Sequence, residues 1–181
     1  MVSVSEEKKQ LRQQIRERKL TMDRDETDRR SAEIFAKVEQ TALFQEAKVV
    51  IVYWSLPDEV KTHDFILKWH DKKMILLPVI SENRIIVKQF TGIRYLQNNE
   101  RYGIPEPVGE LFQDLTKIDL IIVPGMAFDT EGNRLGRGKA FYDIFLRNSN
   151  AFKIGVCFSF QMLPGIPVEE MDIPMDEVIS A

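Results

Sequence analysis

A glycine-rich, cationic segment that runs from Val123 to Asp143 carries the residue types that bind phosphate. Three glycines are interleaved there with three cations, in the order Gly132, Arg134, Gly136, Arg137, Gly138 and Lys139. Glycine lets backbone N–H groups approach an anion closely, and arginine offers forked donors that match phosphate oxygens. Asp143 ends the segment with a carboxylate that could hold a hard cation beside the phosphate. The segment therefore predicts a phosphate site with a divalent cation.

The alternative for the same residues is a glycine-rich surface turn whose charges are merely solvated. The segment matches neither the P-loop pattern G-x-x-x-x-G-K-[ST] nor the dinucleotide pattern G-x-G-x-x-G, which disfavours an ordinary site of either kind. An apolar run at 118–123 predicts a buried strand before the segment, and a helix is predicted after it from Lys139 to about Asn148. The N-terminus of that helix would add partial positive charge near the phosphate.

The composition of the 181-residue chain favours a small anionic ligand over a polymer. A net charge of −3 provides no overall basic field for nucleic acid or an anionic membrane, so the arginines are a local feature. Hydrophobic residues make up 44% and charged residues 29%, as in ordinary globular proteins, and we expect one domain over 1–181 and a monomer. No apolar run approaches the roughly 20 residues of a membrane span, and the charged first twenty residues do not resemble a signal peptide. A cytoplasmic location is expected.

The single cysteine excludes an intrachain disulfide and a cysteine-rich zinc site. Because Cys157 lies in an apolar run, it is predicted to be a buried structural thiol and not a nucleophile. The two histidines, His63 and His70, have no neighbouring ligand or base in the sequence, and we interpret both as surface or packing residues.

The rest of the chain alternates helical and strand patterns. Ser5 is a plausible N-cap for a first helix that ends near Leu20, with Lys8 and Arg12 on one face. Further helices are predicted over 23–40 and after Thr62. Strands are predicted over 48–54, 73–80, 84–90, 118–123, 152–158 and 177–180, of which the second and third form a hairpin. The thirty residues after the hairpin are expected to be irregular, and the proline-containing tail is expected to run extended.

This alternation predicts a three-layer α/β/α fold with a mostly parallel central sheet.

The segment N-R-L-G-R-G-K-A-F-Y-D, residues 133–143, resembles the nucleotide loop of the 5-formyltetrahydrofolate cyclo-ligase family. The resemblance covers nearly the whole chain and includes K-K-Q-L-R, S-L-P-D-E-V, Y-G-I-P-E-P and D-I-P-M-D in the same order. It implies a fold related to the sugar-phosphate isomerase and CoA-transferase group. It also implies ATP- and magnesium-dependent conversion of 5-formyltetrahydrofolate to 5,10-methenyltetrahydrofolate, with release of ADP and phosphate.

The resemblance further implies which residues would bind each ligand. The nucleotide-binding residues would be Lys8, Arg12, Arg134, Leu135, Gly136, Arg137, Gly138, Lys139, Ala140, Phe141 and Tyr142. The folate-binding residues would be Trp54, Glu59, Arg137, Gly138, Lys139, Ala140 and Phe141. Arg137 would be catalytic, because it would stabilise the transferring phosphoryl group. Asp143 and Asp172 would bind magnesium, with Asp176 as a weaker candidate.

Three positions depart from the family pattern. Many members have glycine where Ala140 stands, tyrosine where Phe141 stands and histidine where Met171 stands. If position 140 requires a positive φ, alanine there costs roughly 1–2 kcal/mol. Two other functions remain open: a sugar-phosphate isomerase or CoA-transferase-like enzyme, which would need no nucleotide, and a folate- or nucleotide-binding protein without turnover. The interleaved arginines and the pair Lys8 and Arg12 count against the first of these.

Overall fold

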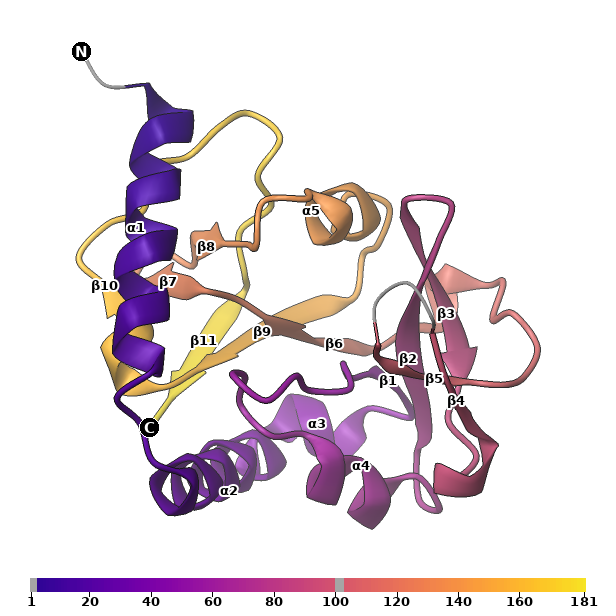
Figure 1. The fold of residues 1–181 in the computed structure, drawn as a ribbon. Helices are drawn as coiled ribbons and strands as arrows, with labels where there is room; N and C mark the ends of the chain where they lie inside the picture. Colours follow the sequence, from indigo (N-terminus) through magenta and orange to yellow (C-terminus); the bar gives the residue numbers. More distant parts are fainter. Residues whose placement is uncertain (1–2, 100–102) are drawn as a thin grey trace.

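The computed structural model, which describes residues 3–99 and 103–181, contains a six-stranded sheet with the strand order β11-β9-β6-β1-β2-β3 (Figure 1). Its strands are β1 (Val49–Ile51), β2 (Met74–Ser81), β3 (Arg84–Gln89), β6 (Leu120–Pro124), β9 (Phe152–Cys157) and β11 (Glu177–Ser180). All neighbouring strands are parallel except β2 and β3, which form an antiparallel hairpin. The predicted mostly parallel sheet and its hairpin are therefore confirmed.

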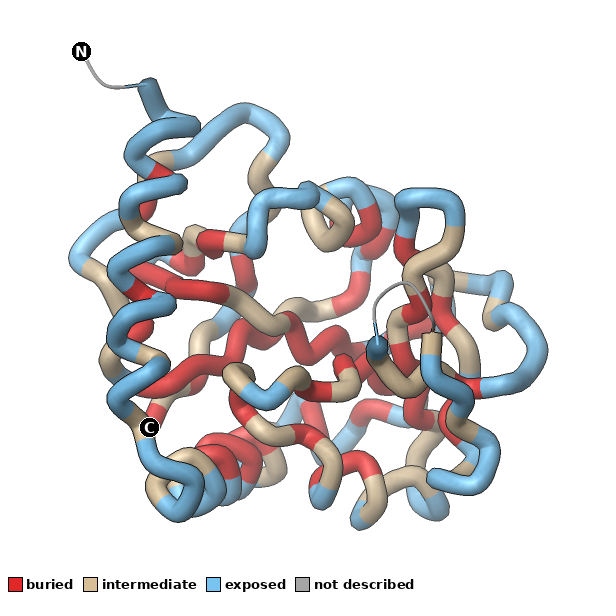
Figure 2. Tube along the Cα trace, in the orientation of Figure 1, coloured by how far each residue is buried: buried red, intermediate tan, exposed pale blue. Residues whose placement is uncertain are grey.

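Helices cover both faces of this sheet. On one face lie α2 (Arg24–Gln40), α3 (Ala42–Glu46) and α4 (His63–Trp69), whereas α5 (Phe141–Leu146) lies on the other (Figure 1). Strand β6 shows why two layers form, since successive strand residues point to opposite faces. Leu120 and Ile122 join the core under α2 and α4, and Ile121 and Val123 join the core under α5. Figure 2 shows these buried positions concentrated along the central strands.

The first helix, α1 (Val4–Lys19), stands at one end of the sheet and is exposed along much of its length (Figure 2). Its N-cap is Ser3 and not the predicted Ser5, because Ser3 Oγ accepts a hydrogen bond from Glu6 N at 3.3 Å. Ser3 and Glu6 have the S-x-x-E spacing of a capping box, which Ser5 lacks. Among the described residues, none of the helices has the length and apolar character to cross a bilayer.

The glycine-rich segment contains regular secondary structure and is not simply a loop. It contains β7 (Ala127–Asp129) and β8 (Arg134–Leu135), which form a small sheet with β10 (Met162–Leu163). The buried carboxylate of Asp129 fixes the turn between β7 and β8, since it accepts from three N–H groups of Glu131 and Asn133 and from Ile166 N, all at 2.9–3.0 Å. At Gly132, where φ is +83°, a Cβ atom would lie 2.4 Å from Met175 O, so only glycine fits.

Other boundaries also differ from the predictions. The strand predicted over 48–54 is limited to β1, and the helix predicted from Lys139 to Asn148 is limited to α5, because Ala140 before it has a left-handed backbone with φ 55°. The connection expected to be irregular contains an antiparallel pair, β4 (Leu96–Asn98) and β5 (Pro105–Pro107). The tail between β10 and β11 contains no helix or strand but includes a turn, in which Asp172 N donates to Glu169 O at 3.0 Å.

Candidate active site

A cavity of about 410 Å³ lies at the carboxyl ends of β1 and β6. The chain leaves β1 toward β2 on one side and later returns to β6 on the other, so the two strands flank a topological switch point. Ligands of open α/β sheets bind at such points. The predicted site residues all line this cavity: Lys8, Arg12, Trp54, Glu59, Arg134, Leu135, Gly136, Arg137, Gly138, Lys139, Ala140, Phe141, Tyr142, Asp143 and Asp172. The structure thus gathers them from separate segments, and their ligands remain predictions.

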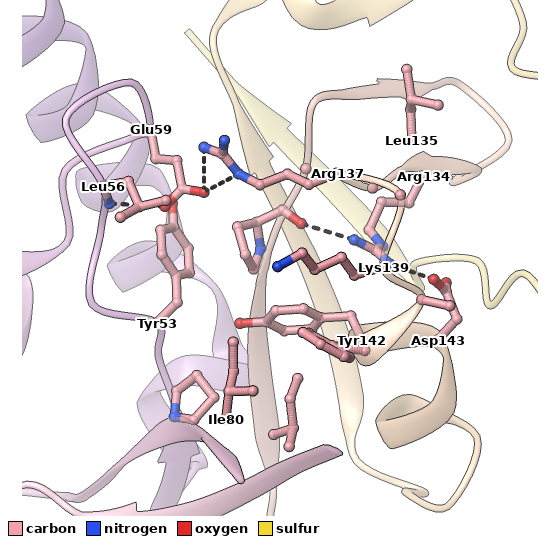
Figure 3. A pocket seen from close by; sticks show the side chains of 18 of the residues that line it. Tyr53, Leu56, Glu59, Ile80, Arg134, Leu135, Arg137, Lys139, Tyr142 and Asp143 are labelled. Atoms are coloured by element: carbon pink, nitrogen blue, oxygen red, sulfur yellow. Dashed lines mark hydrogen bonds and ion pairs between the residues drawn. The ribbon is translucent and has the colours of Figure 1, made fainter. Parts of the chain in front are cut away.

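Arg137 is held by two carboxylates that follow β1, those of Asp58 and Glu59, of which Figure 3 shows Glu59. Its Nη2 donates to Asp58 Oδ1 at 2.6 Å and to Glu59 Oε1 at 3.0 Å, and its Nε donates to the same Glu59 oxygen at 3.2 Å. Glu59 Oε2 in turn accepts from Leu56 N at 2.9 Å. Burial lowers the pKa of Arg137, but Glu59 and Asp58 outweigh it and raise the pKa above its usual value. Arg137, the predicted catalytic residue, and Glu59, a residue predicted to bind folate, therefore contact each other.

Arg134 is engaged inside the protein. Its Nη2 donates to Asp143 Oδ2 at 2.9 Å and its Nη1 to Pro124 O at 3.3 Å, and the side chain is only 4% exposed (Figure 3). Its Nε is buried without a hydrogen-bond partner among the described residues. A Cβ at Gly136 would lie 3.0 Å from Arg134 Nη1, so glycine leaves room for the guanidinium. Arg134, which was predicted to bind phosphate, therefore also fixes the orientation of Asp143.

Helix α1 contributes two of the predicted nucleotide contacts. Lys8 Nζ donates to Glu169 Oε2 at 2.8 Å and to Asp172 Oδ2 at 2.5 Å. Arg12 Nε donates to Gly136 O at 2.7 Å. Burial lowers the pKa of Lys8, but Asp172 and Glu169 outweigh it and hold the pKa above its usual value. These contacts connect α1 both to the tail and to the glycine-rich segment.

The two predicted magnesium ligands line the same cavity, although each is paired with a cation. Asp143 Oδ1 receives only a 3.5 Å contact from Ile173 N, and the pairing of Asp172 with Lys8 uses its Oδ2. No group of three or more metal-ligating side chains occurs within the described ranges. Magnesium is commonly held by one or two carboxylates together with substrate phosphates, so these hard oxygen donors fit a cation shared with a nucleotide. Asp176 lies outside the cavity and accepts from Lys153 N and Nζ.

An apolar wall faces the charged groups. Trp54 lies there and stacks on His63 with ring centroids 4.2 Å apart, which confirms the packing role of that histidine. His63 also contacts Ser55 Oγ at 3.3 Å, and burial lowers its pKa. His70 packs edge-on against Phe90 at 5.3 Å. The indole also packs against Phe90, with ring centroids 5.8 Å apart, so a planar ligand would reach only the part of the half-buried indole that lines the cavity.

Several residues that line the cavity were not predicted: Tyr53, Leu56, Pro78, Ile80, Ile85, Ile104, Glu106, Pro124, Gly125 and Glu169. Tyr53 and Pro124 could have been found, because both lie at the carboxyl ends of predicted parallel strands. The hairpin residues and Glu169 carry no such signal, since their positions depend on the tertiary fold. Tyr102, which begins the motif Y-G-I-P-E-P, lies outside the described residues.

Comparisons with known proteins identify the family and the fold. The model of the 5-formyltetrahydrofolate cyclo-ligase family matches residues 4–181. The 5-formyltetrahydrofolate cyclo-ligase of Mus musculus is 29% identical over 194 residues, which cover 98% of this chain and 95% of the mouse protein. The NMR structure of Aquifex aeolicus 5,10-methenyltetrahydrofolate synthetase matches with a TM-score of 0.86 and 31% identity over 96% of this chain and 89% of that one.

A second solved structure shares the fold at lower identity. The 5,10-methenyltetrahydrofolate synthetase of Mycoplasma pneumoniae matches with a TM-score of 0.77 and 22% identity, over 95% of this chain and 97% of that one. The family match covers every segment that lines the cavity, from Lys8 in α1 to Asp172 in the tail. From the fold, the cavity and these matches together, we conclude that the chain belongs to the 5-formyltetrahydrofolate cyclo-ligase family.

Proposed function

We propose that the protein converts 5-formyltetrahydrofolate and ATP to 5,10-methenyltetrahydrofolate, ADP and phosphate. The observation that best supports this reaction is one cavity that is lined both by phosphate-binding residue types, among them Arg137 and Lys139, and by apolar side chains such as Ile80 (Figure 3). A nucleotide and a planar folate ring could lie side by side there. The same fold and site favour a distant relation to the sugar-phosphate isomerase and CoA-transferase group, and we expect a monomer in the cytoplasm.

The reaction needs a phosphate site because a formamide oxygen is a poor leaving group and its carbon a poor electrophile. Transfer of the γ-phosphoryl group of ATP to the formyl oxygen corrects both faults and releases ADP. The neighbouring folate amine then forms a bond to the formyl carbon and gives up its proton to solvent, and phosphate leaves as the C–O bond breaks. This route needs no protein nucleophile, and the described residues that line the cavity include no serine, cysteine or histidine. Catalysis of this kind depends on alignment and charge stabilisation.

The residues of the cavity divide this work. Backbone N–H groups around Gly136 and Gly138 would bind the phosphates, and the positive φ of 99° at Gly138 suits such a turn. Trp54 would stack on the pterin, and Glu59 would accept hydrogen bonds from its N–H groups. Asp143 and Asp172 would hold magnesium, which neutralises phosphate charge when bound. Arg137 would donate to the transferring phosphoryl group.

The first experiment is to measure phosphate release with ATP alone, with 5-formyltetrahydrofolate alone and with both. The proposed function predicts release only with both substrates, together with formation of 5,10-methenyltetrahydrofolate detected by chromatography. An isomerase or CoA-transferase-like enzyme would not need the nucleotide. A binding protein without turnover would bind both ligands in calorimetry but release no phosphate.

The role of Arg137 can be tested by substitution. Arg137→Ala should lower kcat by on the order of 10²–10³, the range for loss of one preorganised donor, and Arg137→Lys should recover part of this. Arg29→Ala, at an exposed position in α2, is the control for removal of an arginine. A raised KM for ATP with unchanged kcat would instead mean that Arg137 only anchors the nucleotide in the ground state.

A further inference from the structure

Three cations on one face of α1 contact three different segments of the site. Besides Lys8 and Arg12, which reach the tail and the glycine-rich segment, Lys19 Nζ lies 3.2 Å from Asp58 Oδ2 in the segment after β1. Residues spaced by four and seven positions share a helix face, which explains why all three side chains point the same way. The side chain of Lys19 is only 6% exposed, so its charge is removed from water and depends on Asp58.

Asp58 links this helix to Arg137. Its Oδ2 accepts from Lys19, and its Oδ1 accepts from Arg137 Nη2 at 2.6 Å, so each oxygen has a cationic partner. Burial raises the pKa of Asp58, but Lys19 and Arg137 outweigh it and lower the pKa below its usual value. The carboxylate therefore stays ionised and bridges α1 and the glycine-rich segment.

Asp58 and Glu59 both hold Arg137, but the proposed reaction uses them differently. Glu59 Oε2 is occupied by Leu56 N, so only Oε1 faces Arg137 (Figure 3). If Glu59 accepts N–H groups from a pterin, its carboxylate serves the folate, Leu56 N and Arg137 together. Asp58 contacts Arg137 through Oδ1 and Lys19 through Oδ2, so its contact with Arg137 does not depend on Glu59.

We propose that Asp58, fixed by Lys19, is a positioning residue that keeps the Arg137 guanidinium directed into the cavity while Glu59 binds folate. This inference rests on the proposed function, because it assigns Glu59 to folate and Arg137 to the phosphoryl group. The competing explanation is that Asp58 only stabilises the loop after β1. The two explanations differ in whether loss of Asp58 acts through Arg137.

Kinetics of substituted proteins separate them. Asp58→Asn should lower kcat about tenfold, equivalent to about 1.4 kcal/mol, because one charge-assisted hydrogen bond to a half-exposed arginine is lost. The KM values for ATP and folate should change less than kcat. Lys19→Met should lower kcat by a smaller factor, and Lys19→Arg should restore it. Asp71→Asn, at a side chain that is 85% exposed, is the matched control and should have no effect.

A double substitution gives the sharpest test. In the Arg137→Ala protein, the additional Asp58→Asn change should leave kcat unchanged, because Asp58 would have no guanidinium to position. If the tenfold loss persists in that background, Asp58 acts independently of Arg137 and the inference is wrong. A fall in stability without a fall in kcat would also overturn it.

A second readout does not need turnover. Hydrogen exchange of the Arg137 Nη–H groups, which include the Nη2 donor to Asp58, is followed by NMR with and without 5-formyltetrahydrofolate and reports how firmly Asp58 holds the guanidinium. Asp58→Asn should speed this exchange about tenfold, most strongly with folate present, and Asp71→Asn should not. Unchanged exchange in both states would refute the positioning role. Absence of turnover in the unsubstituted protein would instead refute the proposed function, and the exchange measurement would still decide the inference.

Discussion

Replacing Ala140 with glycine should stabilise the protein, because Ala140 has a left-handed backbone with φ 55° and ψ 10° immediately before α5. A non-glycine residue in that conformation costs roughly 1–2 kcal/mol. Glycine removes this cost but gives the unfolded chain more freedom, which offsets about 0.4–1 kcal/mol. Since Ala140 is exposed and makes no side-chain cap hydrogen bond, little packing is lost with its methyl group. The net gain should be about 0.5–1 kcal/mol in the free energy of unfolding.

Denaturant titration and calorimetry can measure this gain, which corresponds to a rise in Tm of about 1–4 °C for a chain of this size. Ala36→Gly is the matched control, because Ala36 is exposed in the middle of α2. That substitution has the same effect on the unfolded chain but should destabilise the protein by about 1 kcal/mol. If Ala140→Gly destabilises the protein as much as Ala36→Gly, the strain assigned to Ala140 does not exist.

Three further predictions concern the metal, the first helix and the cysteine. Asp143→Asn should raise the magnesium concentration required for turnover and weaken the binding of magnesium-ADP measured by calorimetry. Asp176→Asn is the control and should change neither, because Asp176 lies outside the cavity. An unaltered magnesium titration of the Asp143→Asn protein would remove Asp143 from the metal site. Deleting residues 1–12 should weaken ATP binding more than folate binding, because each well-formed charged contact contributes about 1.5–3 kcal/mol to the binding free energy. If calorimetry shows equal losses for the two ligands, the helix has only a structural role. Burial raises the pKa of Cys157 to about 12, so this thiol should react with a thiol reagent at pH 8 only after unfolding. The pKa of a cysteine thiol in the unfolded chain is about 8.5. The contribution of Cys157 to the free energy of unfolding should therefore be complete below that pH and should decline as the pH rises toward the pKa of the folded protein, and denaturant titrations over this pH range would detect the decline.

Long apolar patterns explain which elements could be predicted. The continuous apolar run before the glycine-rich segment predicted β6, and two apolar runs separated by a connection short enough for a hairpin predicted β2 and β3. Strands β7 and β8 were not predicted, because three-residue and two-residue strands carry no period. They pair with each other, and β7 pairs on its other side with β10, a segment that follows more than twenty residues later in the chain.

The same limit applies to the site. The residue types and the family resemblance identified the cations, Glu59 and the two aspartates that line the cavity. The sequence did not indicate that Arg137 contacts Glu59 or that Arg134 contacts Asp143, because charge patterns do not reveal which opposite charges meet in space. Glu169 was missed for the same reason, since its partner Lys8 is 161 positions away.

The contacts of α1 have a consequence for the order in which the protein assembles. Lys8 contacts residues 161 and 164 positions later in the chain, and Arg12 contacts a residue 124 positions later. During synthesis the helix emerges before its partners, which follow only after most of the sheet has been made. Contacts of such long sequence separation form late, because loop-closure entropy opposes them until other structure has formed. We therefore expect nascent chains that end before residue 160 to build sheet structure while Lys8 still lacks its partners, so that the cavity is completed in the last step of folding.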